Sequence, residues 1–320
     1  MIRTVTWKQD TVSDLPESDR PISFPDKLVT RAKNIDSRLI VGLDPDIRQF
    51  PLQMGEWSPR EAIKEFNRLV IEATAEVAVA FKPQIAFYEQ YGIEGLLALQ
   101  DTIAMLRSQG LLCILDAKRN DIEHTAVAYA KAWLAHRDYR GIVANPWQVD
   151  ALTINPYLGS DGIRPFLDTE PSAGLFVLAK TSNPSSQELQ DLKLVSGESV
   201  YERVAALSHT LGEGEKTKSG YTRVGLVVGA TYPEAAVRLR KIAPRALFLM
   251  PGIGAQKGSM EAIKAGSGMD GLGAYAAISR GVLYSFKLNE LKEQWQSALC
   301  RAINKGATAL RDQIRNALDE

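Results

Sequence analysis

Three charged residues stand close together just after a buried apolar run near the middle of the chain. The run at 111–115 predicts a strand, and Asp116, Lys118 and Asp121 follow where it ends. On a strand, Asp116 and Lys118 would point to one face, so a carboxylate and an ammonium would emerge side by side. Burying such charges costs free energy unless something uses them. The pair is therefore either a structural salt bridge or part of a catalytic site, and Asp121 either caps the next helix or belongs to that site.

The elements that must position these charges form a regular alternation of short apolar runs and helical patterns. The predicted strands are 39–43, 77–81, 111–115, 151–154, 175–179, 224–228, 246–250 and about 271–277. The predicted helices are 24–35, 59–73, 93–108, 124–133, 200–211, 233–242, 259–265 and 288–318.

This alternation predicts an α/β protein folded as a single (β/α)8 TIM barrel. No hairpin turn joins successive strands, and no shift in composition marks a linker. We expect a polar, mobile extension at 1–20 and a barrel domain at 21–320, with a loop and helix insertion at about 185–222. The competing fold, a doubly wound sheet, should carry a dinucleotide fingerprint after its first strand, but 42–45 reads GLDP.

Composition narrows the classes of function. The formal net charge of the 320 residues is +0, which gives no basic field to hold nucleic acid or an anionic membrane. The 2 cysteines and 3 widely spaced histidines exclude a disulfide framework and show no metal-ligand spacing. We find no signal peptide and no apolar run long enough to span a membrane. The sequence predicts a soluble, cytoplasmic protein whose ligand is held by a local site.

Two further motifs follow the last two predicted strands. The run PGIGAQKG at 251–258 offers backbone amides on flexible glycines and the side chain of Gln256, and Ser279, Arg280 and Gly281 follow the eighth strand. An arginine can hold phosphate oxygens through a forked pair of hydrogen bonds. Because TIM barrels often bind phosphate after strands seven and eight, the two motifs together predict a phosphate site.

On the other side of the predicted barrel mouth, Lys82 ends the second strand and would face Asp116 and Lys118. Adding Asp121 gives an alternating array of two ammonium and two carboxylate groups. Each charge favours the charged form of its neighbours, so we expect all four to be charged at neutral pH. Such an array can attract or repel a substrate carboxylate, hold a carbanion beside an ammonium and deliver a proton to it.

Seven motifs in barrel order resemble the orotidine 5'-phosphate decarboxylase family, in particular its longer bacterial form with a DAKRxDI motif. They are LIVGLDPD, AFKPQIAFYE, LDAKRNDIEHTA, TINPYLG, LAKTSNP, MPGIGAQKG and ISRG, and the resemblance runs from about Phe24 to the C-terminal helix. One departure is Asn120, where many relatives have glycine. Asparagine tolerates the left-handed conformation better than most residues, so we expect the turn to be kept. The segment between Ser185 and Thr222 is less typical of the family.

The resemblance implies the last step of pyrimidine nucleotide biosynthesis, decarboxylation of orotidine 5'-phosphate to uridine 5'-phosphate, without a metal or organic cofactor. It implies that Lys118 donates a proton to C6 of the pyrimidine, that Asp116 lies beside the substrate carboxylate, and that Lys82 and Asp121 complete the network. The implied substrate-binding residues are Asp44 for a ribose hydroxyl, Ser182 for the pyrimidine amide, and Gln256, Ser279 and Arg280 for the phosphate.

The resemblance also implies a homodimer, in which Asp121 and Thr125 reach into the neighbouring subunit's site. Two other readings remain open. One is a relative in the same barrel family that decarboxylates a sugar-phosphate keto acid through a magnesium-stabilised enediolate. It would share the DxKxxD pattern but would not need Ser182. The other is a catalytically silent, phosphate-binding barrel, for which an interrupted charge array would be expected.

Overall fold

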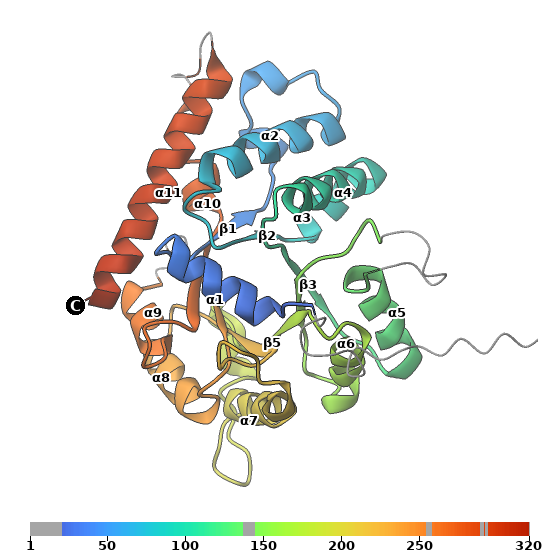
Figure 1. Cartoon of the computed structure of the whole chain (residues 1–320), viewed down its shortest axis with the longest axis vertical. Helices are drawn as coiled ribbons and strands as arrows, with labels where there is room; N and C mark the ends of the chain where they lie inside the picture. The colour runs from blue at the N-terminus through green and yellow to red at the C-terminus, as the bar shows by residue number, and fades with distance from the viewer. Residues whose placement is uncertain (1–20, 137–144, 254–257, 289–290, 292–293, 320) are drawn as a thin grey trace, which may run out of the picture.

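Eight parallel strands form a nearly closed barrel with helices around it (Figure 1). The computed structural model describes residues 21–136, 145–253, 258–288, 291 and 294–319. The strand order is β2-β1-β8-β7-β6-β5-β4-β3, with every ladder parallel. The strands are β1 (Leu39–Leu43), β2 (Ala80–Pro83), β3 (Ile114–Arg119), β4 (Ala151–Ile154), β5 (Gly174–Lys180), β6 (Val224–Val228), β7 (Phe248–Pro251) and β8 (Ala274–Ile278).

Helices follow the strands, as the predicted TIM barrel requires. The α-helices are α1 (Phe24–Asn34), α2 (Pro59–Thr74), α3 (Ala86–Glu89), α4 (Gly92–Ser108), α5 (Glu123–Trp133), α6 (Arg164–Thr169), α7 (Val200–Gly212), α8 (Pro233–Ile242), α9 (Met260–Gly266), α10 (Arg280–Leu283) and α11 (Trp295–Asp319). Short 3-10 turns are η3 (Ile47–Gln49), η4 (Leu52–Met54), η5 (Ser160–Gly162), η6 (Pro184–Glu188) and η7 (Glu213–Glu215). None of the helices in these ranges is both long and apolar enough to cross a membrane.

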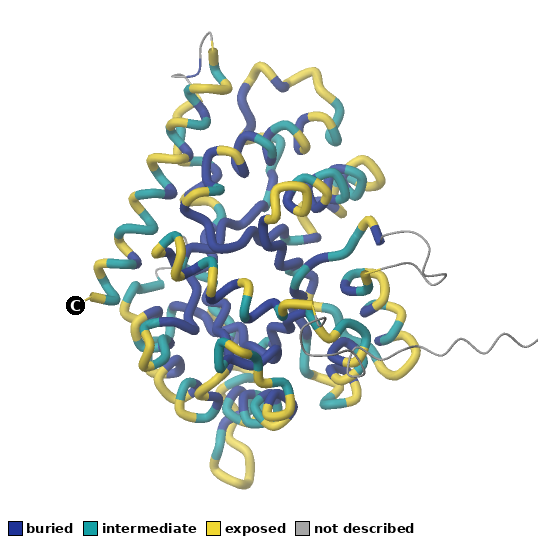
Figure 2. Tube along the Cα trace, in the orientation of Figure 1, coloured by how far each residue is buried: buried dark blue, intermediate teal, exposed yellow. Residues whose placement is uncertain are grey.

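Local sequence signals set the start of the outer helices. Helix α2 begins with a capping box, in which Ser58 and Glu61 satisfy each other's backbone amides, and Pro59 occupies its first turn. One face of the helix is then buried against the barrel. Figure 2 shows the same pattern around the ring, with buried chain at the strands and exposed chain on the outer sides of the helices. The barrel is held by this inward apolar packing.

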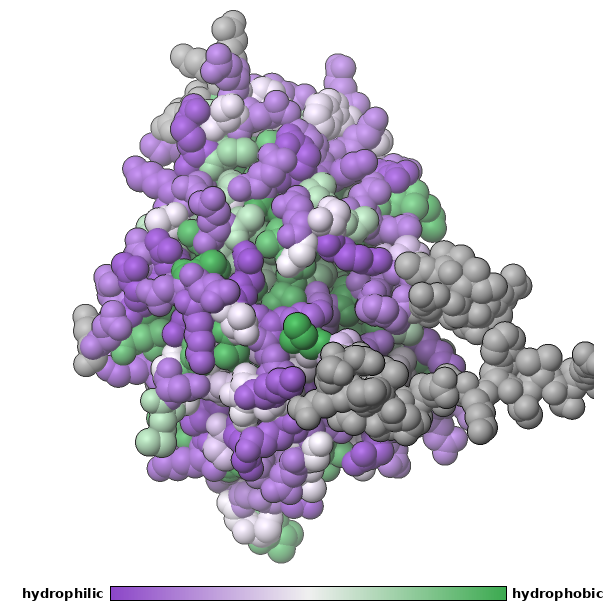
Figure 3. Space-filling view, in the orientation of Figure 1, coloured by the Kyte–Doolittle hydropathy of each residue, from purple (hydrophilic) through white to green (hydrophobic). Residues whose placement is uncertain are grey.

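Helix α1 closes the amino-terminal end of the barrel and lies across the front of the strands in Figure 1. Its Leu28 packs into the interior cluster with Ile40 and Tyr275. Arg31 donates hydrogen bonds to the carbonyls of Ala75 and Ala78, just before β2. Hydrophilic side chains dominate this face of the molecule (Figure 3). The carboxyl ends of the strands, where TIM barrels carry their active sites, lie at the opposite end of the barrel.

The ring closes between β2 and β3 through a thin contact. Seven strand pairs form ladders, two of them with a register shift. Among the residues placed in the structure, β2 and β3 share only two isolated bridges, Phe81 with Cys113 and Gln84 with Asp116. Backbone hydrogen bonds run from Phe81 to Leu112 at 2.8 Å and from Ile85 to Asp116 at 3.2 Å. The closure falls at the strand ends that carry Lys82 and Asp116.

Most predicted elements are confirmed, and the differences have local causes. The strand predicted at 111–115 is found at Ile114–Arg119, because the charged residues continue the strand and pair with β4. The second strand begins at Ala80 and not at 77. The last helix begins at Trp295 and not at 288, and a short helix, α10, precedes it. The extension predicted at 1–20 lies outside the described residues.

Candidate active site

A cavity of about 470 Å³ lies at the carboxyl ends of β1, β2, β3, β7 and β8. Its wall brings together residues that the sequence placed at separate strand ends, which is where TIM-barrel sites are built. The predicted site residues on its wall are Asp44, Lys82, Asp116, Ser279 and Arg280. The charged side and the phosphate side of the predicted site therefore share one cavity.

Asp116 stands between two lysines at this mouth. Its Oδ1 lies 2.7 Å from Nζ of Lys118, and its Oδ2 lies 3.2 Å from Nζ of Lys82. Asp44 extends the chain of charges, with Oδ1 3.8 Å from the Lys82 ammonium. The Lys82 side chain is 7% exposed and the Lys118 side chain 42%, so one ammonium is embedded and the other faces outward. The predicted neighbourhood of these three charges is confirmed.

The charges hold one another in the ionised form. Burial alone would raise the pKa of the Asp116 carboxyl, but Lys82, Lys118 and the hydrogen bonds to the carboxylate outweigh it, so this pKa is lowered. Burial alone would lower the pKa of the Lys82 ammonium, but the charges of Asp44 and Asp116 outweigh it, and that pKa is raised. A buried carboxylate and a buried ammonium are thus both charged at neutral pH.

Lys118 reaches Asp116 from an irregular part of β3. Its φ is +49°, in the left-handed region that a non-glycine residue rarely adopts. The pairing of β3 with β4 shifts register between Leu115 and Arg119 at the same place. Asn120, which replaces the glycine of many relatives, is not among the positive-φ residues, so its position does not use the left-handed conformation that asparagine was expected to tolerate. The unusual backbone conformation falls on the lysine itself.

Thr153, on β4, supplies hydrogen-bond partners where the register of β3 and β4 shifts. Its role was not predicted from the sequence. Its hydroxyl donates to Oδ1 of Asp116 at 2.9 Å and accepts from the amides of Ala117 and Lys118 at 3.0 and 2.9 Å. Thr153 is 1% exposed. Thr153 opens the TINPYLG motif and is a polar residue in an otherwise apolar run, but neither feature indicates which groups its hydroxyl contacts.

Two tyrosine hydroxyls hold the backbone of the loop that carries Asp44. The hydroxyl of Tyr88 donates to the carbonyl of Leu43 at 3.0 Å, and the hydroxyl of Tyr284 donates to the carbonyl of Asp44 at 3.3 Å. Asp44 itself keeps a buried oxygen, Oδ1, that accepts no hydrogen bond from any described residue. An acceptor left unpaired in a cavity is a place for a ligand donor.

The predicted phosphate side is formed at the start of α10. Ser279 precedes the helix and Arg280 is its first residue, with an exposed side chain at the cavity. A Cβ on Gly42 of β1 would lie 1.9 Å from the hydroxyl oxygen of Ser279, so β1 must carry glycine here to let β8 approach. Gln256 lies outside the described residues.

Four predicted residues that the structure describes do not line this cavity, namely Lys118, Asp121, Thr125 and Ser182. Lys118 is joined to the cavity wall through its contact with Asp116. Asp121 accepts a hydrogen bond from the amide of Ile122 at 2.8 Å, and no ion pair of the described chain joins it to Lys82 or Lys118. It does not cap α5, whose N-cap is Ile122, so the capping interpretation was wrong. Thr125 is exposed on the first turn of α5.

Ser182 follows β5 and lies against β6, where a Cβ on Gly229 would be 2.8 Å from its backbone. Beside it, Lys180 is a second buried lysine, 2% exposed, that sequence reasoning did not place in the site. Its ammonium lies 2.7 Å from Asp191 and 3.2 Å from the hydroxyl of Ser186. It also lies 4.5 Å from the ring centre of Tyr232. Lys180 fastens the segment after β5 to the barrel.

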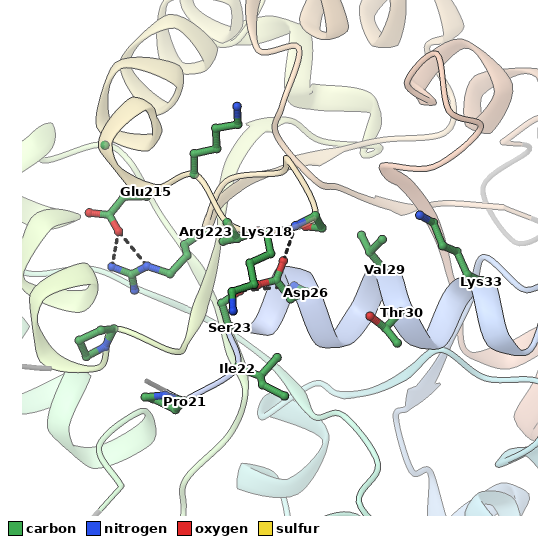
Figure 4. A pocket seen from close by; sticks show the side chains of 15 residues that line it. Pro21, Ile22, Ser23, Asp26, Val29, Thr30, Lys33, Glu215, Lys218 and Arg223 are labelled. Atoms are coloured by element: carbon green, nitrogen blue, oxygen red, sulfur yellow. Dashed lines mark hydrogen bonds and ion pairs between the residues drawn. The ribbon is translucent and has the colours of Figure 1, made fainter. Parts of the chain in front are cut away.

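A larger cavity, of about 630 Å³, lies at the other end of the barrel, between α1 and the loop around η7 (Figure 4). Its acidic groups are satisfied within the wall. Glu215 pairs with Arg223 at 2.6 Å, and Asp26 accepts from Ser23 at 2.7 Å and from the amide of Ser219 at 2.6 Å. We place the candidate active site at the smaller cavity, because unpaired and strained groups converge there. Within the described ranges, no group of three or more His, Cys, Asp or Glu residues is arranged to hold a metal ion.

Comparison with known proteins points to one family over most of the chain. Residues 37–289 match the model of the "Orotidine 5'-phosphate decarboxylase / HUMPS family". The chain is similar to the orotidine 5'-phosphate decarboxylase of Rhodopirellula baltica, with 39% identity over 292 residues, covering 87% of this chain and 95% of that protein. It is 45% identical over 242 residues to the enzyme of the same name from Halorubrum lacusprofundi, covering 75% and 78% of the two chains.

Solved structures give the same result. The chain superposes on the orotidine monophosphate decarboxylase of Leishmania donovani with a TM-score of 0.66 and 36% identity, covering 90% of this chain and 99% of that one. Superposition on Leishmania donovani UMP synthase gives a TM-score of 0.67 and 38% identity, covering 90% of this chain and 57% of that one.

Proposed function

The chain belongs to the orotidine 5'-phosphate decarboxylase / HUMPS family and is a decarboxylase, and from this premise we propose that it converts orotidine 5'-phosphate to uridine 5'-phosphate and carbon dioxide. This reaction completes the synthesis of the first pyrimidine nucleotide. The observation that carries the proposal is the placement of Asp116 between the ammonium groups of Lys82 and Lys118. Asp116 and Lys82 line the same cavity as Arg280.

The cavity offers a separate partner for each part of the substrate. Arg280 and Ser279, with Gln256, would bind the phosphate, and the unpaired oxygen of Asp44 would accept a hydrogen bond from a ribose hydroxyl. Ser182 would bind the pyrimidine amide. In this arrangement the carboxylate to be lost would lie near Asp116, and C6 would lie near Lys118.

The chemistry then needs one bond cleavage and one proton transfer. The bond between C6 and the carboxylate carbon breaks, carbon dioxide leaves, and the electron pair stays on C6 in the plane of the ring. The pyrimidine π system does not delocalise that pair. The ammonium of Lys118 stabilises it and donates a proton to C6, and the lysine amine later regains a proton from water.

A single ammonium does not supply the whole effect. One preorganised donor contributes about 2.7 to 4 kcal/mol, whereas enzymes lower barriers by about 8 to 23 kcal/mol. We propose that the remainder comes from the fixed charges of Asp116 and Lys82 and from the phosphate, whose binding energy holds the substrate against the array. The Asp116→Asn variant tests the charge contribution, because a chemical step of unchanged rate would exclude it.

The test of the reaction is the absorbance change of purified protein with orotidine 5'-phosphate in excess chelator, run beside Lys118→Ala. We expect conversion to uridine 5'-phosphate by the wild type and a loss of about 10²-fold or more in kcat in the variant. No conversion by folded wild-type protein would contradict the proposal. Conversion of a sugar-phosphate keto acid that stops in chelator would instead establish the magnesium-dependent alternative, and no turnover of either substrate would favour a silent barrel.

We further propose that the enzyme is a cytoplasmic homodimer with Asp121 and Thr125 at the neighbour's site. Exposed apolar side chains beside Asp121 support an interface there, because Ile122 is 55% and Tyr157 81% exposed. Leu158 belongs to the same surface, since its Cβ and the Asp121 carbonyl lie 3.2 Å from the position of a Cβ on Gly162.

Mixing two inactive variants tests this sharing. After subunit exchange, Lys118→Ala and Asp121→Ala should together recover about a quarter of wild-type activity, because half of the dimers are mixed and each mixed dimer has one intact site. Either variant exchanged with itself is the control. If the mixture stays inactive while light scattering shows mixed dimers, Asp121 acts within its own subunit.

A further inference from the structure

Thr153 is a buried polar residue whose contacts all lead to the charged array. It is the third residue of β4, and its side chain is covered by the ends of β3 and β4. Its neighbours along the strand, Leu152 and Ile154, are fully buried apolar residues. A hydroxyl in such surroundings costs free energy unless its hydrogen bonds are made.

The hydroxyl of Thr153 makes every hydrogen bond available to it. It has one proton and two acceptor sites. The proton goes to Oδ1 of Asp116 at 2.9 Å, and the acceptor sites take the amides of Ala117 and Lys118. Because both acceptor sites are filled by backbone amides, the proton has only the carboxylate to point at. The hydroxyl therefore holds the Asp116 oxygen that also contacts Lys118.

The same contacts account for the conformation of Lys118. Where β3 loses its register with β4, the amides of 117 and 118 no longer find strand carbonyls, and the Thr153 oxygen replaces them. The ladder resumes with the amide of Asn155 donating to the carbonyl of Arg119 at 3.1 Å. A left-handed lysine persists only where its surroundings fix it, and this hydroxyl is the side-chain group that does so.

We infer that Thr153 is a positioning residue of the reaction, whose hydroxyl fixes the Asp116 carboxylate and the left-handed turn that carries the Lys118 ammonium toward the substrate. This inference rests on the proposed function. Thr153 is 1% exposed and its hydroxyl is fully used by Asp116 and the amides of Ala117 and Lys118, so it acts through Asp116 and Lys118 and not by touching the substrate.

The test compares Thr153→Val, which keeps the shape and removes the hydroxyl, with Thr153→Ser, which keeps the hydroxyl. A misplacement of the reacting groups by about 1 Å can cost about 10²-fold in rate. We expect kcat to fall about 10 to 10²-fold in Thr153→Val, with KM and the Kd of uridine 5'-phosphate within about three-fold of wild type, and Thr153→Ser to recover most of the rate. The acid limb of kcat should also move to higher pH in Thr153→Val, because Asp116 then keeps only Lys82 and Lys118 as partners.

Thr74→Val is the matched control. Its hydroxyl is equally buried and donates to the carbonyl of Val70 within α2, away from the array. We expect wild-type kcat from it. If Thr153→Val does not fold, Thr153→Ala replaces it, and the ratio of kcat between the Ser and Ala variants should be about ten or more.

A Thr153→Val enzyme with wild-type kcat, or a Thr153→Ser enzyme as slow as Thr153→Val, would overturn the inference. Failure of the proposed function is a different outcome, since wild-type protein would then not convert orotidine 5'-phosphate at all.

Discussion

Lys82 and Lys180 are both buried lysines at the carboxyl ends of strands in one barrel, yet their surroundings differ. Lys180 has close partners in Asp191 and Ser186, which come from the segment directly after its own strand. Lys82 has one hydrogen bond of 3.2 Å to Asp116 and a longer contact of 3.8 Å to Asp44. Its partners come from two other strands, and one of their oxygens accepts no hydrogen bond from the described chain.

Burial of an ammonium therefore does not identify an active site. The Lys180 ammonium is hydrogen-bonded to Asp191 and Ser186, and these contacts hold the loop after β5 against the barrel. Around Lys82 one carboxylate oxygen accepts no hydrogen bond from the described chain, and the group lines a cavity that can hold a ligand. The difference lies in the partners and not in the lysines, and this claim can be tested by removing each ammonium in turn.

The largest expected effect is on catalysis. Lys82→Met removes the ammonium from the array and should lower kcat about 10² to 10³-fold, the usual cost of one preorganised charged or polar donor. Lys180→Met makes the same chemical change outside the cavity and should leave kcat within about three-fold of wild type at saturating substrate. Steady-state kinetics of both variants measure this, and an equal loss of kcat in the two would remove the distinction between the regions.

The next effect is on stability and concerns the Lys180 region. Asp191→Ala leaves an ammonium that is 3% exposed without its carboxylate, and should lower the free energy of unfolding by about 3 kcal/mol. Lys180→Met should cost less, because the carboxylate left behind is 44% exposed and can be hydrated. Urea unfolding midpoints show which variant loses more stability. A larger loss of unfolding free energy in Lys180→Met than in Asp191→Ala would contradict the prediction.

The smallest effect is that of pH. The pKa of Asp116 is lowered, so its contribution to stability is complete above the unfolded value of about 3.9 and is lost as pH falls through the folded value. The pKa of Lys82 is raised, so its contribution is complete below the unfolded value of about 10.4 and is lost as pH rises through the folded value. Titration of these two groups should therefore change kcat by less than about two-fold between about pH 5 and 9. If the pH profile of kcat has a limb near neutral pH, and Asp116→Asn removes that limb, then the array titrates near neutral pH and this prediction is wrong.

The sequence predicts the frame of the molecule better than its irregular parts. The strands at 151–154 and 224–228 and the helix at 233–242 have the predicted bounds, because apolar runs and a first-turn proline determine them locally. The end of β3 was predicted too early, because charged residues normally end a buried strand, whereas here they continue it.

The same limit applies to the site. Lys82, Asp116 and Lys118 could be found from their charge at strand ends, and their contacts are confirmed. Thr153 could not, because its role depends on a register shift in the neighbouring strand. Such a shift is a property of two segments together and leaves no pattern in either one.

The thin closure between β2 and β3 has an evolutionary consequence. Seven junctions of the ring are held by backbone ladders, which most substitutions leave intact, while this junction relies on two bridges together with the contact of Lys82 and Asp116. Selection for a closed ring and selection for turnover thus act on the same two side chains. A descendant of this chain that lost both side chains would keep only the backbone bridges at this junction.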